Sequence, residues 1–92
     1  MGELRKEVMR LLERGAILID YPHMFEEGHR IADWEIHTAL LDGAYEIHED
    51  IEDRYVAKYA RKREGVVVTA IFEIHEVPGT RYVFVLTAFG PR

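Results

Sequence analysis

The chain of 92 residues has no cysteine, only three prolines and no apolar run that approaches the length of a membrane span. Without cysteine it can form neither disulfides nor thiolate metal sites, so its core must hold without covalent cross-links. The longest apolar runs cover residues 66–72 and 82–89, whereas a bilayer span needs about 20 apolar residues. The charged, amphipathic N-terminus is unlike a signal peptide. We therefore expect a cytoplasmic protein with no membrane partner.

The composition predicts a folded chain with one hydrophobic core. Apolar residues make up 48% of the chain and charged residues 32%. This balance excludes intrinsic disorder, because enough apolar surface is present to offset the entropy lost on ordering. A chain of this length cannot bury two separate cores, so residues 1–92 are predicted to form a single α+β domain.

The net charge of −5 is unevenly distributed along the chain. Residues 20–53 carry eleven acidic side chains and one basic one, whereas residues 54–92 carry seven basic and three acidic ones. Two oppositely charged surfaces could attract a polyanion or a second copy of the chain. The simpler interpretation is a solvated acidic layer of helices.

Helical periodicity is confined to the first half of the chain. Apolar residues at helical spacing predict a helix over residues 3–14, in an N-terminal unit 1–15 that ends at Gly15. Residues 16–43 are predicted to contain a strand or extended link at 16–20, a short helix at 23–31 and a second clear helix. That helix is predicted to run from an N-cap at Asp33 to about Leu41, with Trp34 as a core anchor and Gly43 as its stop.

After Gly43 the apolar period changes from 3.6 toward two. Segments rich in Val, Ile, Tyr and Phe predict strands at 44–49, 54–61, 66–76 and 81–89, separated by short turn clusters. Residues 44–92 are thus predicted to form a four-stranded antiparallel meander, or a five-stranded sheet if 16–20 joins it, with the helices packed on one face. Strands apolar at both alternate positions belong inside a sheet, so we expect the last two to be central and 44–49 to lie near an edge.

Alternation along these strands gathers polar side chains on the face that the helices leave uncovered. Glu46 shares a strand face with His48, and Glu73 shares one with His75. Cationic side chains are predicted to join them, with Arg81 placed on the face of Thr87, provided that the register does not slip by one residue. The candidate catalytic residues are therefore His48, Lys58, His75 and Arg81.

Three interpretations of this face remain open. An imidazole can act as a general acid or base while cations stabilise an anionic transition state, as metal-free RNA cleavage requires. Imidazoles and carboxylates can instead bind a divalent metal such as zinc or manganese. The simplest interpretation is a solvated face of ordinary cross-strand pairs. We expect no metal and no cofactor.

A basic run, Arg61, Lys62 and Arg63, lies where a strand enters a turn. A protruding basic hairpin can contact nucleic-acid phosphates, so these three residues are the candidate nucleic-acid-binding site. The same run is also typical of a hairpin tip that protects a sheet edge.

Several segments over residues 21–91 share a pattern with one superfamily of small proteins. They are His23 at the start of a helix, Ile-Ala-Asp-Trp-Glu-Ile-His-Thr-Ala-Leu-Leu-Asp-Gly at 31–43, Val-Val-Val-Thr at 66–69 and Leu-Thr-Ala-Phe-Gly-Pro at 86–91. In these segments, and in its helices followed by an antiparallel meander, the chain resembles the RelE/ParE toxin superfamily, in particular its BrnT-like branch and related small domains. The helix in residues 1–15 is an addition.

The resemblance implies a ribonuclease toxin with active groups on the exposed sheet face and an antitoxin as its partner. Toxins of this kind are usually basic, and the arginines expected in the helix after His23 are replaced here by Glu26 and Glu27. We therefore expect a toxin-like domain that cleaves or contacts RNA, and keep as the alternative a non-catalytic domain that binds a partner protein or itself. A homodimer fits both, because a small domain gains stability by covering a sheet edge.

Overall fold

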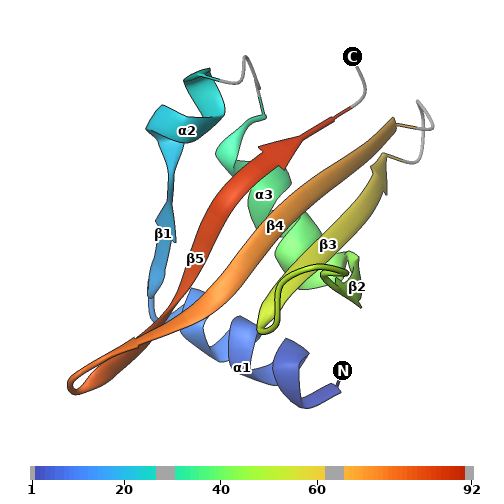
Figure 1. The fold of residues 1–92 in the computed structure, drawn as a ribbon. Helices are drawn as coiled ribbons and strands as arrows, with labels where there is room; N and C mark the ends of the chain where they lie inside the picture. The colour runs from blue at the N-terminus through green and yellow to red at the C-terminus, as the bar shows by residue number, and fades with distance from the viewer. Residues whose placement is uncertain (1, 27–30, 62–65, 91–92) are drawn as a thin grey trace.

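The computed structural model describes residues 2–26, 31–61 and 66–90 and arranges them as an α+β fold (Figure 1). The predicted fold class is confirmed, and four strands follow Gly43. None of the helices in the described ranges has the length and apolar character needed to cross a membrane. The elements in chain order are α1 (Gly2–Glu13), β1 (Ile17–Ile19), α2 (Tyr21–Glu26), α3 (Asp33–Asp42), β2 (Ala44–Ile47), β3 (Arg54–Arg61), β4 (Val66–Val77) and β5 (Thr80–Phe89).

The sheet has five strands in the order β1-β5-β4-β3-β2. β2 to β5 pair antiparallel in succession, but β1 pairs parallel with β5, with Ile17 opposite Val83 and Ile19 opposite Val85. The sheet is therefore mixed, and the prediction of a purely antiparallel meander is wrong at this edge. A strand of three residues is too short for its sequence to show which strand it joins or in which direction. β2 forms the opposite edge and β4 and β5 lie inside, as predicted.

Helix α2 begins two residues earlier than predicted because the aspartate before it caps the helix. The Asp20 carboxylate accepts a hydrogen bond from the backbone N–H of His23 at 3.2 Å, which satisfies one of the free donors of the first turn. The described part of the helix ends at Glu26. Residues 27–30 of the predicted helix 23–31 lie outside the described residues.

The sequence predicts Asp33 as the N-cap of α3, but the N-cap in the structure is Ala32. The Glu35 carboxylate accepts a hydrogen bond from the Ala32 N–H at 3.3 Å, so a side chain inside the first turn reaches back to the start of the helix. The prediction that Trp34 is a core anchor is also wrong, because its side chain is 63% exposed. The buried side of α3 starts instead with Glu35 and Ile36.

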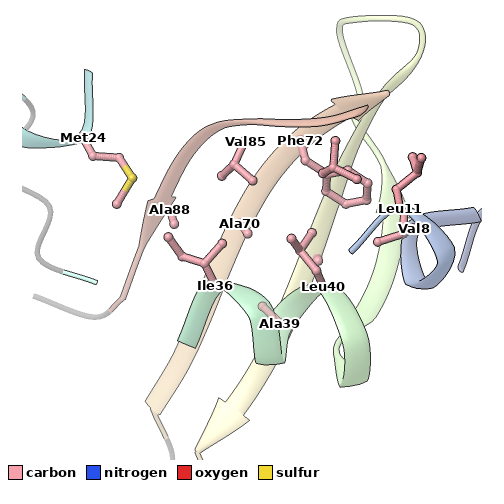
Figure 2. Packing of buried hydrophobic residues seen from close by; sticks show 12 residues of the cluster. Val8, Leu11, Met24, Ile36, Ala39, Leu40, Ala70, Phe72, Val85 and Ala88 are labelled. Carbon is pink, nitrogen blue, oxygen red and sulfur yellow. The ribbon is translucent and has the colours of Figure 1, made fainter. Parts of the chain in front are cut away.

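The core lies between the helices and one face of the sheet (Figure 2). Ile36, Ala39 and Leu40 of α3 point toward the sheet, where Phe72 is the largest fully buried side chain. The three helices therefore pack on one sheet face, as predicted, and none of the described helices covers the other. The same cluster also contains Val8, Leu11, Met24, Ala57, Ala70, Val83, Val85 and Ala88.

Arg5 of α1 joins the end of α3 to the start of β2. Its guanidinium donates hydrogen bonds to the carbonyl oxygens of Leu41, at 2.6 Å, and of Gly43, and lies 4.3 Å from the centroid of the Tyr45 ring. A cation at the carboxyl end of a helix also complements the helix dipole. Burial raises the pKa of the Tyr45 hydroxyl, which remains protonated and donates to the Leu40 carbonyl.

Candidate functional site

The uncovered face of the sheet carries the side chains that alternate with the core. In β3, Tyr55, Ala57 and Tyr59 contact the core, so Arg54 and Lys58 lie on the opposite face. By the same alternation, the core residues Phe72 and Ile74 of β4 leave Glu73 and His75 on the uncovered face. In β5, Tyr82 and Phe84 alternate with the buried Val83 and Val85.

Four of these side chains form one hydrogen-bonded chain across three strands. The Arg54 Nε donates to one oxygen of the Glu73 carboxylate at 2.9 Å, and His75 Nε2 lies 2.8 Å from the other oxygen. His75 Nδ1 lies 3.3 Å from the Tyr82 hydroxyl. Register explains the arrangement, because Arg54 is paired with Glu73 and His75 with Tyr82.

The protonation of this chain follows from the state of Glu73. The hydrogen bond from His75, and less strongly Arg54, lowers the pKa of the Glu73 carboxyl below its usual 4.5, although burial opposes the shift. An ionised carboxylate only accepts hydrogen bonds, so His75 Nε2 must carry the hydrogen that lies between them. In the neutral ring Nδ1 is then the acceptor, and the Tyr82 hydroxyl donates to it.

Glu73→Gln is expected to lower stability by about 1 kcal/mol at neutral pH, because the charge-assisted hydrogen bonds of the carboxylate are lost. Since folding lowers the pKa of Glu73, its contribution is present above pH 4.5 and is lost as the pH falls through the lower pKa of the folded protein. The stability difference between parent and variant should therefore be constant above pH 4.5 and shrink as the pH falls below it. Denaturant unfolding at several pH values measures it.

Glu46→Gln is the matched control for this substitution. Glu46 also pairs with a cation on the uncovered face, but 56% of its side chain is exposed, against 21% for Glu73. Exposed ion pairs contribute about 0–1 kcal/mol, so Glu46→Gln should have little effect at any pH. If the stability difference between the parent and Glu73→Gln stayed constant from pH 6 to pH 3, the ionised state assigned to the Glu73 carboxyl would be wrong.

Aromatic rings orient the imidazole of His75. Its ring stacks on Phe84 at a centroid distance of 4.8 Å and an interplanar angle of 21°, and it meets the Tyr82 ring edge-on at 5.4 Å. About a third of the side chain is still exposed, at 36%. An imidazole that is fixed by a carboxylate and two rings and remains open to solvent has the features of a general acid or base.

Lys58 and His48 lie along a groove of about 660 Å³ on the same face, near the β2 edge. Lys58 Nζ is 3.1 Å from the Glu46 carboxylate. His48 follows β2, donates its backbone N–H to the Arg54 carbonyl and accepts a hydrogen bond at Nδ1 from the Asp50 N–H at 3.2 Å. The apolar side chains along the groove are Ile47, Val56, Val67, Ile71 and Phe89.

Arg81 lies on the helix-covered side of the sheet, contrary to the prediction. Its neighbour Tyr82 is on the uncovered face, and the Arg81 guanidinium is 2.9 Å from the Glu7 carboxylate of α1. A second contact, at 3.6 Å, joins it to Glu76 of β4. Arg81 and His75 are therefore separated by the sheet and cannot act on one substrate group.

A bulge in β5 is the physical cause of this error. Ile71 is paired with Thr87, but the next residue of β4, Phe72, is paired with Val85, so Leu86 is an extra residue in β5. One extra residue reverses the alternation of side chains, and positions two apart in sequence no longer predict a common face across it. The cation on the hydrogen-bonded chain is Arg54, which strand alternation predicts on the face of Lys58 but which was not among the candidate catalytic residues.

The structure describes only one residue of the predicted nucleic-acid-binding run. Arg61 is the last residue of β3 and is paired with Val66 of β4. Lys62 and Arg63 lie outside the described residues. Among residues 2–26, 31–61 and 66–90, no group of three or more His, Asp or Glu side chains lies close enough together to hold a metal ion.

Comparison with known proteins adds no relative: no family model matches the chain, and searches of curated proteins and of solved structures found no significant match.

Proposed function

We propose that the uncovered sheet face binds single-stranded RNA and cleaves it by acid–base catalysis, with His75 as the general base and no metal ion taking part. The observation that carries the proposal is the hydrogen-bonded chain from Glu73 through His75 to Tyr82, beside the Arg54 guanidinium. Such an activity is what the resemblance to the RelE/ParE superfamily implies. The hydrogen-bonded side chains are the specific residues that we propose for it.

The chemistry uses the 2′-hydroxyl group that RNA itself provides. A base takes the hydroxyl proton, the 2′-oxygen forms a bond to the adjacent phosphorus, and the bond from phosphorus to the 5′-oxygen breaks. The leaving oxygen takes a proton from water. The substrate hydroxyl would replace Tyr82 at His75 Nδ1, because the present contact of 3.3 Å is long for a hydrogen bond and easily exchanged. The ionised Glu73 then stabilises the imidazolium that forms.

On this face Arg54, which is paired with Glu73, can bind the phosphate that is attacked. Lys58, which is paired with Thr69, can bind a more distant phosphate of the same RNA strand. Arg54 uses Nε to contact Glu73, so its two terminal nitrogens remain for a phosphate oxygen. Lys58 is 46% exposed, and its ion pair with Glu46 is correspondingly weak, so a phosphate group can displace the carboxylate. Cations near the phosphate stabilise the charge that develops on it during attack.

Aromatic side chains on the same face supply surface for unpaired bases. Tyr82 and Phe84 lie beside His75, and Phe89 borders the groove that contains Lys58. A base that stacks on an aromatic side chain contributes roughly 1–3 kcal/mol whatever its identity, so this surface favours single strands over duplexes. We therefore expect weak sequence preference.

The test is cleavage of a short single-stranded RNA by the purified protein. His75→Gln, which keeps a polar side chain of similar size but cannot take up a proton, is expected to lower the rate by about a hundredfold to ten-thousandfold. The products should carry 2′,3′-cyclic phosphate ends, and the corresponding DNA should not be cut because it lacks the 2′-hydroxyl. Gel electrophoresis and mass spectrometry measure both.

His37→Gln is the matched control, because His37 lies on α3, away from the uncovered sheet face. Its rate should stay within about twofold of the parent, as for a residue outside the reaction. If the parent cleaves no RNA, the enzyme proposal is wrong. If the parent cleaves and His75→Gln cleaves equally fast, RNA is the substrate but His75 is not the base.

The apolar lining of the groove favours one alternative, in which the uncovered face binds a second copy of the chain and has no catalytic role. Val56, Val67 and Ile71 would be covered in such a dimer. The face also carries acidic and basic groups side by side, and a twofold interface needs this self-complementarity. A dimer in sedimentation equilibrium, together with no cleavage of RNA, would favour this alternative over the enzyme.

A further inference from the structure

Helix α1 and the β4–β5 hairpin lie at the same end of the molecule (Figure 1). A hollow of about 370 Å³ lies between them, on the side of the sheet away from His75. Three arginines line it. Arg10 belongs to α1, Arg14 directly follows that helix, and Arg81 lies at the start of β5. Two glutamates, Glu7 and Glu76, also line it, so the hollow carries one net positive charge in a chain whose net charge is −5.

The three arginines are not equivalent. Arg81 is held by Glu7 at 2.9 Å and by Glu76 at 3.6 Å, so its charge is already compensated and its position is set. Arg10 and Arg14 are exposed, and within residues 2–26, 31–61 and 66–90 neither of them has a carboxylate partner. Their charges are therefore available to a ligand.

The spacing of the two available arginines suits one anionic group. Arg14 donates its backbone N–H to the Arg10 carbonyl at 3.3 Å, so the helical geometry of α1 extends to it and the two side chains lie one turn apart on the same face. Guanidinium groups bind phosphate through pairs of parallel N–H donors, and two of them can share its oxygens. Arginines at the carboxyl end of a helix can also serve only to complement the helix dipole. That role would require neither the hollow nor the third arginine.

We propose that this hollow binds the phosphate group of an organic phosphate through Arg10 and Arg14, with Arg81 as a third, fixed cation. The hollow is larger than inorganic phosphate needs and lies in the roughly 300–1,000 Å³ range of small-molecule sites, so the ligand is of nucleotide size. The phosphate belongs either to a free small molecule or to the backbone of an RNA chain. The site is independent of the proposed RNA cleavage, because the sheet separates it from His75.

The proposal is tested by isothermal titration calorimetry of the full chain with pyrophosphate, ADP and an eight-nucleotide RNA at low ionic strength. We expect saturable binding, and Arg10→Gln and Arg14→Gln should each weaken it by about tenfold through the loss of charge-assisted hydrogen bonds. Both side chains are exposed, so the thermal midpoint of each variant should match that of the parent. Saturation by ADP identifies a free ligand, and saturation by RNA alone that Arg10→Gln weakens identifies a backbone phosphate, because RNA bound at the uncovered sheet face would not respond to that variant.

Lys6→Gln is the matched control. It removes one positive charge from an exposed position on the same helix, but Lys6 does not line the hollow. Its affinity should remain within about twofold of the parent, since only unspecific charge is lost. The proposal is wrong if the parent binds none of the three ligands saturably, or if Lys6→Gln weakens binding as much as Arg10→Gln and Arg14→Gln do.

Discussion

Phe72→Ala is expected to destabilise the protein by about 3–5 kcal/mol, the range for truncation of a buried phenylalanine. The side chain is completely buried, and its ring packs against those of Tyr45 and Tyr55 at centroid distances of 5.4 and 5.6 Å. Alanine would leave a cavity between α3 and the sheet that neither element can close, because each is held by its own backbone hydrogen bonds. Domains of this size have a total stability of only about 5–15 kcal/mol, so much of it would be lost.

Denaturant unfolding followed by circular dichroism measures this loss, and the thermal midpoint should fall by about 12 °C or more. Phe89→Ala is the matched control, since Phe89 lies in the same sheet but is 36% exposed on the uncovered face. It should cost about 1 kcal/mol or less. Equal losses for the two variants would show that the helix-covered face is not the main core.

Gly43→Ala is expected to cost about 3 kcal/mol or more, because a methyl group at this position has no space. Its Cβ would lie 2.4 Å from the carbonyl oxygen of Ala39 and 2.7 Å from that of Lys58. Both are backbone atoms, one in α3 and one in β3, and neither can turn away as the end of a side chain would. The φ angle of Gly43 is −72°, so the requirement for glycine comes from the close approach of helix and strand and not from a left-handed conformation.

Gly2→Ala is the control for the addition of a methyl group to a glycine. No atom lies within 4 Å of a Cβ built at Gly2, so stability should change by no more than about 0.5 kcal/mol. Thermal unfolding of both variants measures the contrast. A midpoint for Gly43→Ala within 2 °C of the parent, which is roughly 0.5 kcal/mol or less for a domain of this size, would mean that α3 and β3 separate easily at this point.

At Gly43 the local sequence predicts where a helix ends but not the physical reason. The sequence predicted that α3 stops at this glycine, and the helix does end at Asp42. Glycine often ends a helix in a left-handed cap, but here φ is −72° and the structure requires room for the Lys58 carbonyl. The signal was correct because glycine satisfies both requirements, but only the packing of α3 on β3 shows which one applies.

The site shows the same limit more clearly. Alternation along β4 was enough to place Glu73 and His75 on one face, because residues two apart in a regular strand share a side. Tyr82 reaches His75 across a hairpin, and Arg54 reaches Glu73 from a strand position 19 residues away, and the sequence carries no signal for that register. Alternation therefore placed Arg54 on the face of Lys58 but not opposite Glu73, and Arg81 was chosen as a candidate catalytic residue instead.

The sequence by itself determined that the helices precede the four strands after Gly43, that β2 lies at an edge and that one sheet face is polar. Each of these features depends on local apolar periodicity. Only the tertiary structure decided that β1 joins β5 in parallel, that the bulge at Leu86 sends Arg81 to the helix side, and that Arg54, Glu73, His75 and Tyr82 form one chain. These features depend on which strands pair and in what register, and pairing is set by the packing of the whole core rather than by any single segment.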